Sequence, residues 1–175
     1  WTFSACQTHM KKGQEKGAAE QHYDEVCRNF EPVFRYFFIE KYEEPALWVG
    51  RRLNYVRSVA ATSMVGYILG IGDRHASNIL LDETTADLVH IDFGITFDQG
   101  KVLRTPETVP FRLTRDMVDG MGVSGVEGTF RRCSEEVLQV LRDNAPQLLT
   151  ILEVVIYDPL YKWVITPKKG EKPED

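Results

Sequence analysis

The chain has few of the residues that mark secreted, zinc-binding or nucleic-acid-binding proteins. Its 175 residues include only three cysteines, Cys6, Cys27 and Cys133. Their odd number and wide separation predict neither a disulfide framework nor a zinc site. The four histidines show no metal-ligand spacing either. The formal net charge of −5 argues against direct contact with nucleic acid. Together these absences favour a reducing, intracellular compartment.

Long apolar runs are also absent. The longest, at 64–71, is interrupted by glycine and is far shorter than the ~20 residues that a membrane-spanning helix needs. The chain begins with Trp1 and shows no signal or transit peptide, so we expect a piece of a longer protein with no membrane contact. Hydrophobic residues make up 43% and charged residues 27%. This composition is typical of one globular domain with a substantial core.

Apolar residues at helical spacing predict a mostly helical chain. The expected helices are at about 3–13, 18–30, 32–44, 45–69, 114–119, 126–144 and 146–157. The longest of them, 45–69, has an expected buried stripe of Val49, Leu53, Val56, Ala60, Met64 and Tyr67. An aromatic-rich group before it is expected in the core: Val33, Phe34, Phe37, Phe38 and Tyr42. Pro32 suits the first turn of the helix that carries this group.

Two short strands are predicted after the long helix, at 79–81 and 88–91, joined by a polar turn. Residues 93–112 show neither helical nor strand periodicity. A loop of that length inside a compact domain is usually functional. Thr114 is a plausible N-cap for the next helix.

The segments around the two strands carry the residues with the clearest chemistry. Residues 70–78 read GIGDRHASN, and the second strand is followed by Asp-Phe-Gly at 92–94. Phosphoryl transfer requires a group that orients the attacking hydroxyl and groups that hold Mg²⁺ against the nucleotide phosphates. Asp73 is placed for the first task, and Asn78 and Asp92 are placed for the second. The order and spacing of the three predict a phosphotransferase site.

Two histidines have different expected roles. His75 lies two residues from Asp73 in the same glycine-framed loop, so it could handle a proton or stabilise charge, or make only a structural hydrogen bond. His90 lies on a strand and is interpreted as structural. Residues 120–125 match the dinucleotide fingerprint GxGxxG. However, a charged helical segment precedes them where that motif requires a buried strand, so we interpret them as a loop between helices.

These motifs also resemble a known family. GDRHASN with HIDFG is similar to the catalytic and metal-binding loops of the phosphatidylinositol 3- and 4-kinase superfamily, in which the order is Asp-Arg-His rather than His-Arg-Asp. The runs at 105–116 and 121–133 resemble the phosphatidylinositol 3-kinase-related protein kinases, and among them most closely the ataxia-telangiectasia mutated branch. The resemblance covers most of residues 25–163.

The resemblance implies an α+β, mostly α fold: the C-terminal lobe of a PI3/PI4-kinase-like catalytic domain over 1–165. Short strands would surround the catalytic and metal-binding loops, and 166–175 would form a disordered tail. It also implies a nuclear serine/threonine protein kinase of the DNA-damage response that uses ATP with Mg²⁺ or Mn²⁺. Substrates would carry Ser or Thr followed by Gln, and DNA-break-sensing protein complexes would be partners.

The resemblance also assigns roles to individual residues. Asp73 and His75 would be catalytic, Asn78 and Asp92 would bind metal, and Leu80 and Ile91 would form the floor of the adenine pocket. The implied activation segment spans about 92–112 and includes Phe93, Gly94, Thr108, Val109, Pro110 and Phe111.

Two alternatives to a protein kinase remain open. A phosphoinositide kinase lobe is disfavoured because residues 95–111 carry two cations and two anions, a net charge of zero, whereas an inositol polyphosphate needs excess positive charge. The cations are Lys101 and Arg104, and the anions are Asp98 and Glu107. A non-catalytic interaction module is the other alternative. The family's glycine-rich phosphate loop and strand lysine are not in this sequence, nor is the C-terminal segment that follows the lobe. We therefore expect the chain alone to be inactive.

Overall fold

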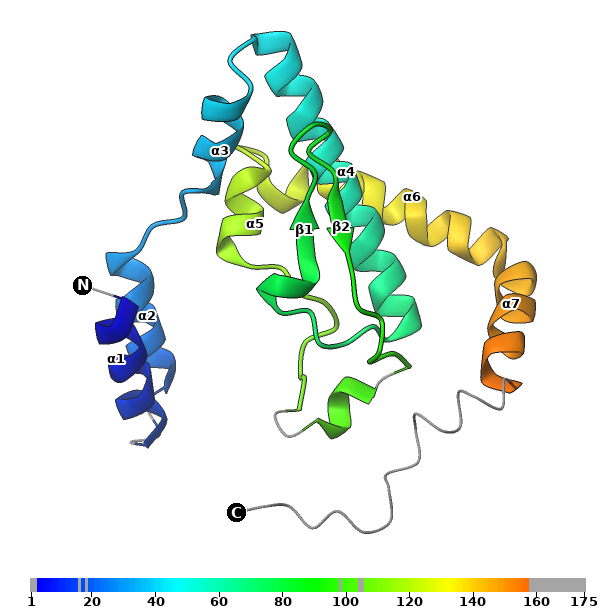
Figure 1. Ribbon diagram of the computed structural model, residues 1–175, viewed down its shortest axis with the longest axis horizontal. Helices are drawn as coiled ribbons and strands as arrows, with labels where there is room; N and C mark the ends of the chain where they lie inside the picture. Colours follow the sequence, from blue (N-terminus) through cyan, green and yellow to red (C-terminus); the bar gives the residue numbers. More distant parts are fainter. Residues whose placement is uncertain (1–2, 16, 18, 98, 104–105, 158–175) are drawn as a thin grey trace.

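The computed structural model describes residues 3–15, 17, 19–97, 99–103 and 106–157, which form a mostly helical chain with a two-stranded antiparallel hairpin (Figure 1). The elements in order are α1 (Phe3–Glu15), α2 (Ala19–Asn29), α3 (Phe34–Lys41), α4 (Pro45–Leu69), β1 (Ile79–Leu81), β2 (Leu88–His90), α5 (Arg115–Gly120), α6 (Thr129–Asp143) and α7 (Ala145–Tyr157). Short 3₁₀ turns lie at η1 (Ala76–Asn78), η2 (Gln99–Val102) and η3 (Gly125–Glu127). The predicted mostly helical fold with two short strands is confirmed.

Helix α4 is the element on which α3, α6 and β2 pack, and its predicted bounds are confirmed. Pro45 occupies its first turn, and Gly70 ends it in the left-handed conformation with φ 59°. Its middle is buried as predicted at Val56, Ala60 and Met64, but the ends of the expected stripe were wrong. Val49 and Tyr67 are 40% and 53% exposed. The buried residues Tyr55, Val59 and Ser63 show that the covered face is turned from the predicted stripe toward the neighbouring elements.

The core lies where α3, α5 and α6 meet the middle of α4. Phe38 and Tyr55 are almost completely buried, with ring centroids 5.1 Å apart. The Tyr55 hydroxyl donates a hydrogen bond of 2.9 Å to the carbonyl of Met117, which joins α4 to α5. The aromatic group predicted for the core is confirmed apart from Val33, which is 61% exposed. Because Val33 is the N-cap of α3, Pro32 precedes the helix instead of lying in its first turn.

The hairpin is anchored on α4. Its register pairs Leu80 with Val89 at the centre, and the Leu88 N–H donates to the hydroxyl of Ser58 on α4 at 2.8 Å. The Asp82 carboxylate accepts two backbone N–H groups and closes the turn, a contact that lowers the pKa of this carboxyl. Strand β2 ends at His90, one residue before the predicted end. The backbone pairing nevertheless continues, because the next N–H donates to the carbonyl of Asn78 at 3.0 Å.

The segment after the hairpin returns through α5 and α6. Thr114 caps α5 as expected, since its hydroxyl accepts the N–H of Met117 at 3.3 Å. Residues 121–124 link α5 to η3, so a helix and not a strand precedes the GxGxxG match, and the interpretation as a connecting loop is confirmed. Among the described helices, none combines the length and apolar character of a membrane span. The expected tail at 166–175 lies outside the described residues.

Candidate active site

The candidate catalytic loop leaves the C-terminal end of α4 and packs against the segment that follows β2. The buried Gly72 donates its N–H to the carbonyl of Ile95 at 2.9 Å. The next residue, Asp73, has φ 57°, and Asp92 in the facing loop has the same value. This left-handed region costs a residue with a side chain roughly 1–2 kcal/mol, although Asp tolerates it better than most. Two predicted site residues therefore have backbones that their surroundings must stabilise.

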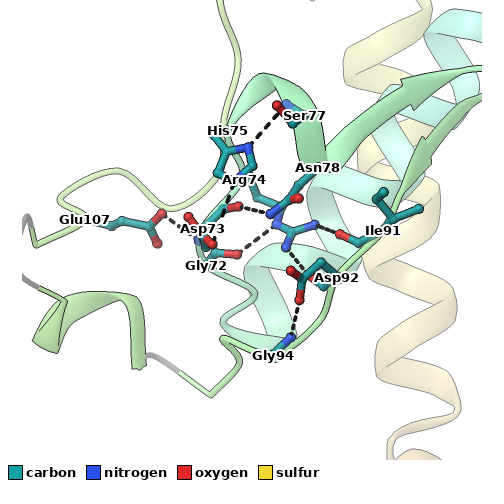
Figure 2. A network of polar contacts seen from close by, with 10 residues as sticks. All are labelled: Gly72, Asp73, Arg74, His75, Ser77, Asn78, Ile91, Asp92, Gly94 and Glu107. Carbon is teal, nitrogen blue, oxygen red and sulfur yellow. Dashed lines mark hydrogen bonds and ion pairs between the residues drawn. The ribbon is translucent and has the colours of Figure 1, made fainter.

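The backbone of Asp73 is hydrogen-bonded on both sides (Figure 2). Its N–H donates to the Oε1 atom of Glu107 at 2.7 Å. Its carbonyl accepts the side-chain amide of Asn78 at 2.9 Å. The side chain of Asp73 is 44% exposed. Because the backbone makes both hydrogen bonds, neither of them uses the carboxylate.

Asn78 and Asp92 offer oxygen atoms of the kind that Mg²⁺ prefers. The amide nitrogen of the buried Asn78 donates its hydrogen bond to the carbonyl of Asp73, so the Oδ1 atom is left to act as a cation ligand. Asp92 accepts the N–H of Gly94 through Oδ1 at 3.1 Å, and its second carboxylate oxygen makes no hydrogen bond within the described residues. Those residues contain no group of three or more His, Cys, Asp or Glu that could hold a metal alone. One carboxylate and one amide fit an ion that is also bound by nucleotide phosphates.

Arg74 connects the two loops, a role that was not predicted from the sequence. Its side chain is buried, and its guanidinium donates to the carbonyls of Gly72 at 2.8 Å, Ile91 at 2.7 Å and Asp92 (Figure 2). The guanidinium also lies 5.6 Å from the ring centroid of Phe93. The loop that carries Asp73 and the loop that carries Asp92 are therefore held by one cation. Its position between two predicted catalytic residues was the signal that could have identified it.

His75 makes a structural contact and also faces Asp73. Its Nδ1 atom accepts the N–H of Ser77 at 3.2 Å, which caps η1. The proton of the neutral ring is therefore on Nε2, which lies 4.0 Å from the Asp73 carboxylate. Both roles considered for His75 are compatible with this geometry. His90 lies on β2, where burial and then the charge of Arg74 lower its pKa, as suits a neutral ring.

Leu80 and Ile91 present apolar surface beside these polar groups. They are 47% and 40% exposed, and Val89 and Phe93 are similarly exposed. The described residues thus leave this face of the hairpin uncovered. Its assignment to the adenine base remains a prediction.

A cavity of about 880 Å³ lies on the other side of Asp73, between the catalytic loop and residues 106–112. Asp73 and His75 line it. The predicted activation-segment residues Thr108, Val109, Pro110 and Phe111 line it too. Phe93, Gly94, Asn78, Asp92, Leu80 and Ile91 do not. The predicted site residues therefore fall into two groups that meet at Asp73.

Glu107 is the second functional candidate that was not predicted from the sequence. It entered the sequence analysis only as one charge in a balance, yet it lines the cavity and binds the backbone of Asp73. Of the other charges in that balance, Lys101 also lines the cavity. Asp98 and Arg104 lie outside the described residues.

Comparison with known proteins agrees with these motifs. A family model described as phosphatidylinositol 3- and 4-kinase matches residues 2–165. The chain is 59% identical to the serine/threonine-protein kinase ATM of Arabidopsis thaliana and 56% identical to the serine-protein kinase ATM of Sus scrofa, in each case over 97% of the chain. These alignments cover only 4% and 6% of those relatives, so the chain spans a small part of their length.

A solved structure described as the FAT and kinase domain of CtTel1 has the same fold. It superposes with a TM-score of 0.88 at 48% identity, over 94% of this chain and 12% of that one. The chain thus resembles part of the ATM and Tel1 serine/threonine kinases in both sequence and structure. It belongs to the phosphatidylinositol 3- and 4-kinase family.

Proposed function

We propose that residues 1–165 are the C-terminal lobe of a serine/threonine protein kinase and that this site transfers a phosphoryl group from ATP to a peptide hydroxyl. Membership in a kinase family implies ATP as the donor. The observation that carries the proposal is the placement of Asp73, which shares one hydrogen-bond network with Asn78 and Asp92 and opens onto a cavity on its other side.

Each predicted residue has a task in this proposal. Asp73 either aligns the substrate hydroxyl or also accepts its proton, and the Nε2–H of His75 stabilises charge at the transferring group. Asn78 and Asp92 would hold Mg²⁺, which when bound neutralises phosphate charge. Leu80 and Ile91 would support the adenine base. The peptide would lie against the activation-segment residues that line the cavity: Thr108, Val109, Pro110 and Phe111.

The charges around the cavity favour a peptide over an inositol phosphate. Three cations line it, but the guanidinium of Arg74 is committed to three carbonyls. The remaining two, Lys101 and Arg112, are balanced by the carboxylates of Asp73 and Glu107. A polyphosphorylated headgroup would meet an excess of only one positive charge there, and that charge belongs to Arg74, whose N–H groups already bind carbonyls. Kinship with the ATM and Tel1 kinases supports the finer proposals: Ser-Gln and Thr-Gln substrates, DNA-break-sensing protein partners, a DNA-damage role and a nuclear location.

Asp92→Asn in the intact kinase tests the metal and phosphotransfer roles. Asn tolerates the left-handed backbone but removes the charge that would face Mg²⁺. We expect turnover of a Ser-Gln peptide with MgATP to fall at least about 100-fold, as when one charge-stabilising group is removed. Asp87→Asn, a matched change at the end of the hairpin turn, should leave turnover close to the starting value. Unchanged turnover in Asp92→Asn would refute the proposal, and phosphorylation of phosphoinositide vesicles but not of peptide would favour a lipid kinase.

A further inference from the structure

Glu107 reaches the catalytic loop from the side opposite Asn78 (Figure 2). Its carboxylate accepts the N–H of Asp73 at 2.7 Å, although the two residues are 34 positions apart in the chain. Its own N–H donates to the carbonyl of Gly100 at 3.0 Å. Glu107 is therefore fixed at its backbone and at its carboxylate, and it joins the segment that lines the cavity to the residue that faces the substrate hydroxyl.

Two glycines leave the space that this carboxylate occupies. A Cβ atom built on Gly100 would lie 2.2 Å from the Oε2 atom of Glu107, and one built on Gly72 would lie 2.5 Å from the same atom. Neither glycine has a positive φ, so glycine is not needed at these positions for its backbone conformation. It is needed because any side chain would collide with the Glu107 carboxylate. The backbone around Glu107 thus forms a fitted recess that holds the carboxylate against Asp73.

We propose that Glu107 is a positioning residue that holds Asp73 in its left-handed conformation and so couples the cavity-lining segment to the alignment of the substrate hydroxyl. The inference rests on the proposed function. Asp73 has φ 57°, a conformation that needs external support. Its N–H donates to a carboxylate at 2.7 Å, and hydrogen bonds to a charged acceptor are shorter and stronger than those to a neutral one. Asn78 fixes the carbonyl of the same residue, so losing Glu107 would leave Asp73 fixed on one side only.

This role predicts an effect on kcat. Glu107 binds a backbone group of the enzyme, and its removal would leave the adenine face and the other cavity-lining residues unchanged in sequence. A reacting group displaced by about 1 Å can cost about 100-fold in rate. In the intact kinase we therefore expect Glu107→Ala to lower kcat by about 10- to 100-fold, with KM for ATP and for a Ser-Gln peptide within about twofold of the starting values. Glu136→Ala, at an exposed glutamate of α6 that pairs with Arg132, is the control and should leave both constants unchanged.

Conservative replacement separates positioning from a general structural role. The side-chain carbonyl of Glu107→Gln can still accept the Asp73 N–H, so this variant should recover most of the lost kcat. Hydrogen exchange at the Asp73 amide should be faster in the Ala variant and close to the starting rate in the Gln variant. Gly100→Ala retains Glu107 but displaces its carboxylate, and it should reproduce the kcat loss even if the Ala variant folds poorly.

Several results would overturn the inference. These are a kcat in Glu107→Ala equal to that of Glu136→Ala, a raised peptide KM with unchanged kcat, or equal impairment of the Gln and Ala variants. If Asp92→Asn still abolishes turnover in those cases, the proposed function stands and only the role of Glu107 is refuted. If Asp92→Asn remains active, the proposed function itself fails.

Discussion

Replacing Arg74 with Lys should loosen the connection between the loop that carries Asp73 and the loop that carries Asp92. The guanidinium uses three different nitrogens to reach carbonyls in both loops. A Lys ammonium is a single nitrogen on a flexible stem and cannot reproduce this planar arrangement, so we expect it to retain one of the three bonds. A hydrogen bond to a charged group contributes about 1.5–3 kcal/mol, which gives an upper range of about 3–6 kcal/mol for the two that are lost.

The lower end of that range is the better expectation. Ile91 and Asp92 are exposed, so water can replace part of what their carbonyls lose, whereas the buried Gly72 has less access to water. A loss of about 3 kcal/mol in local stability corresponds to roughly 100-fold more frequent opening, because each 1.4 kcal/mol is a factor of ten.

Hydrogen exchange in the intact kinase measures this opening directly. The informative amides are those of Gly72, which donates to Ile95, and Ile91, which donates to Asn78. Both should exchange roughly 100-fold faster in Arg74→Lys. Arg131→Lys is the matched control, because this exposed arginine pairs with Glu127 of η3 and Glu135 of α6, away from both loops. Exchange at both amides within about twofold of the starting rate would show that Arg74 does not hold the loops together.

Two further predictions concern the adenine face and the hairpin. A polypeptide of residues 1–175 alone should show little or no turnover of a Ser-Gln peptide with MgATP. Leu80 and Ile91 are 47% and 40% exposed, so this chain would cover the adenine base on one side only. Turnover close to that of the intact kinase would contradict this prediction. His90 has a folded-state pKa below its ordinary value of 6.5, through burial and then through Arg74, so the folded hairpin binds the proton less readily than the unfolded chain. The contribution of His90 to hairpin stability should therefore be fully present above pH 6.5 and should be lost as the pH falls below that value. His90→Asn should make hairpin stability less dependent on pH. Hydrogen exchange of the hairpin amides, corrected for the intrinsic exchange rate at each pH, measures this.

Local sequence signals predicted most of the fold that positions the site. Pro45 and Gly70 mark the ends of α4 because each restricts or permits a particular backbone conformation, and the side chain of Thr114 identifies the start of α5. Periodicity performed less well at the ends of α4. Whether Val49 and Tyr67 are buried depends on how far the packed elements extend along the helix, which a helical repeat does not encode.

The parts of the site that the sequence did not reveal act through the backbone. Asp73, Asn78 and Asp92 are recognisable because their side-chain chemistry recurs at a fixed order and spacing. Arg74 and Glu107 instead supply a donor or an acceptor to peptide groups, which every residue has, so their side-chain chemistry does not identify their partners. The position of Arg74 between Asp73 and His75 is a signal, but Glu107 has none of this kind. Their partners become neighbours only after folding.

The two residues nevertheless solve the same physical problem. Asp73 and Asp92 both have φ 57°, and each has a backbone group bound by a charged side chain from another segment: Glu107 binds the N–H of Asp73, and Arg74 binds the carbonyl of Asp92. The Asp73 carboxylate makes neither of the hydrogen bonds that hold its loop, and Asp92 uses only one carboxylate oxygen, Oδ1, to hold its own. Glu107 belongs to the cavity-lining segment, so movement of that segment would displace Asp73. Arg74 belongs to the loop that carries Asp73, so movement of that loop would in turn displace Asp92. The hydroxyl alignment proposed for Asp73 and the metal binding proposed for Asp92 are therefore expected to change together.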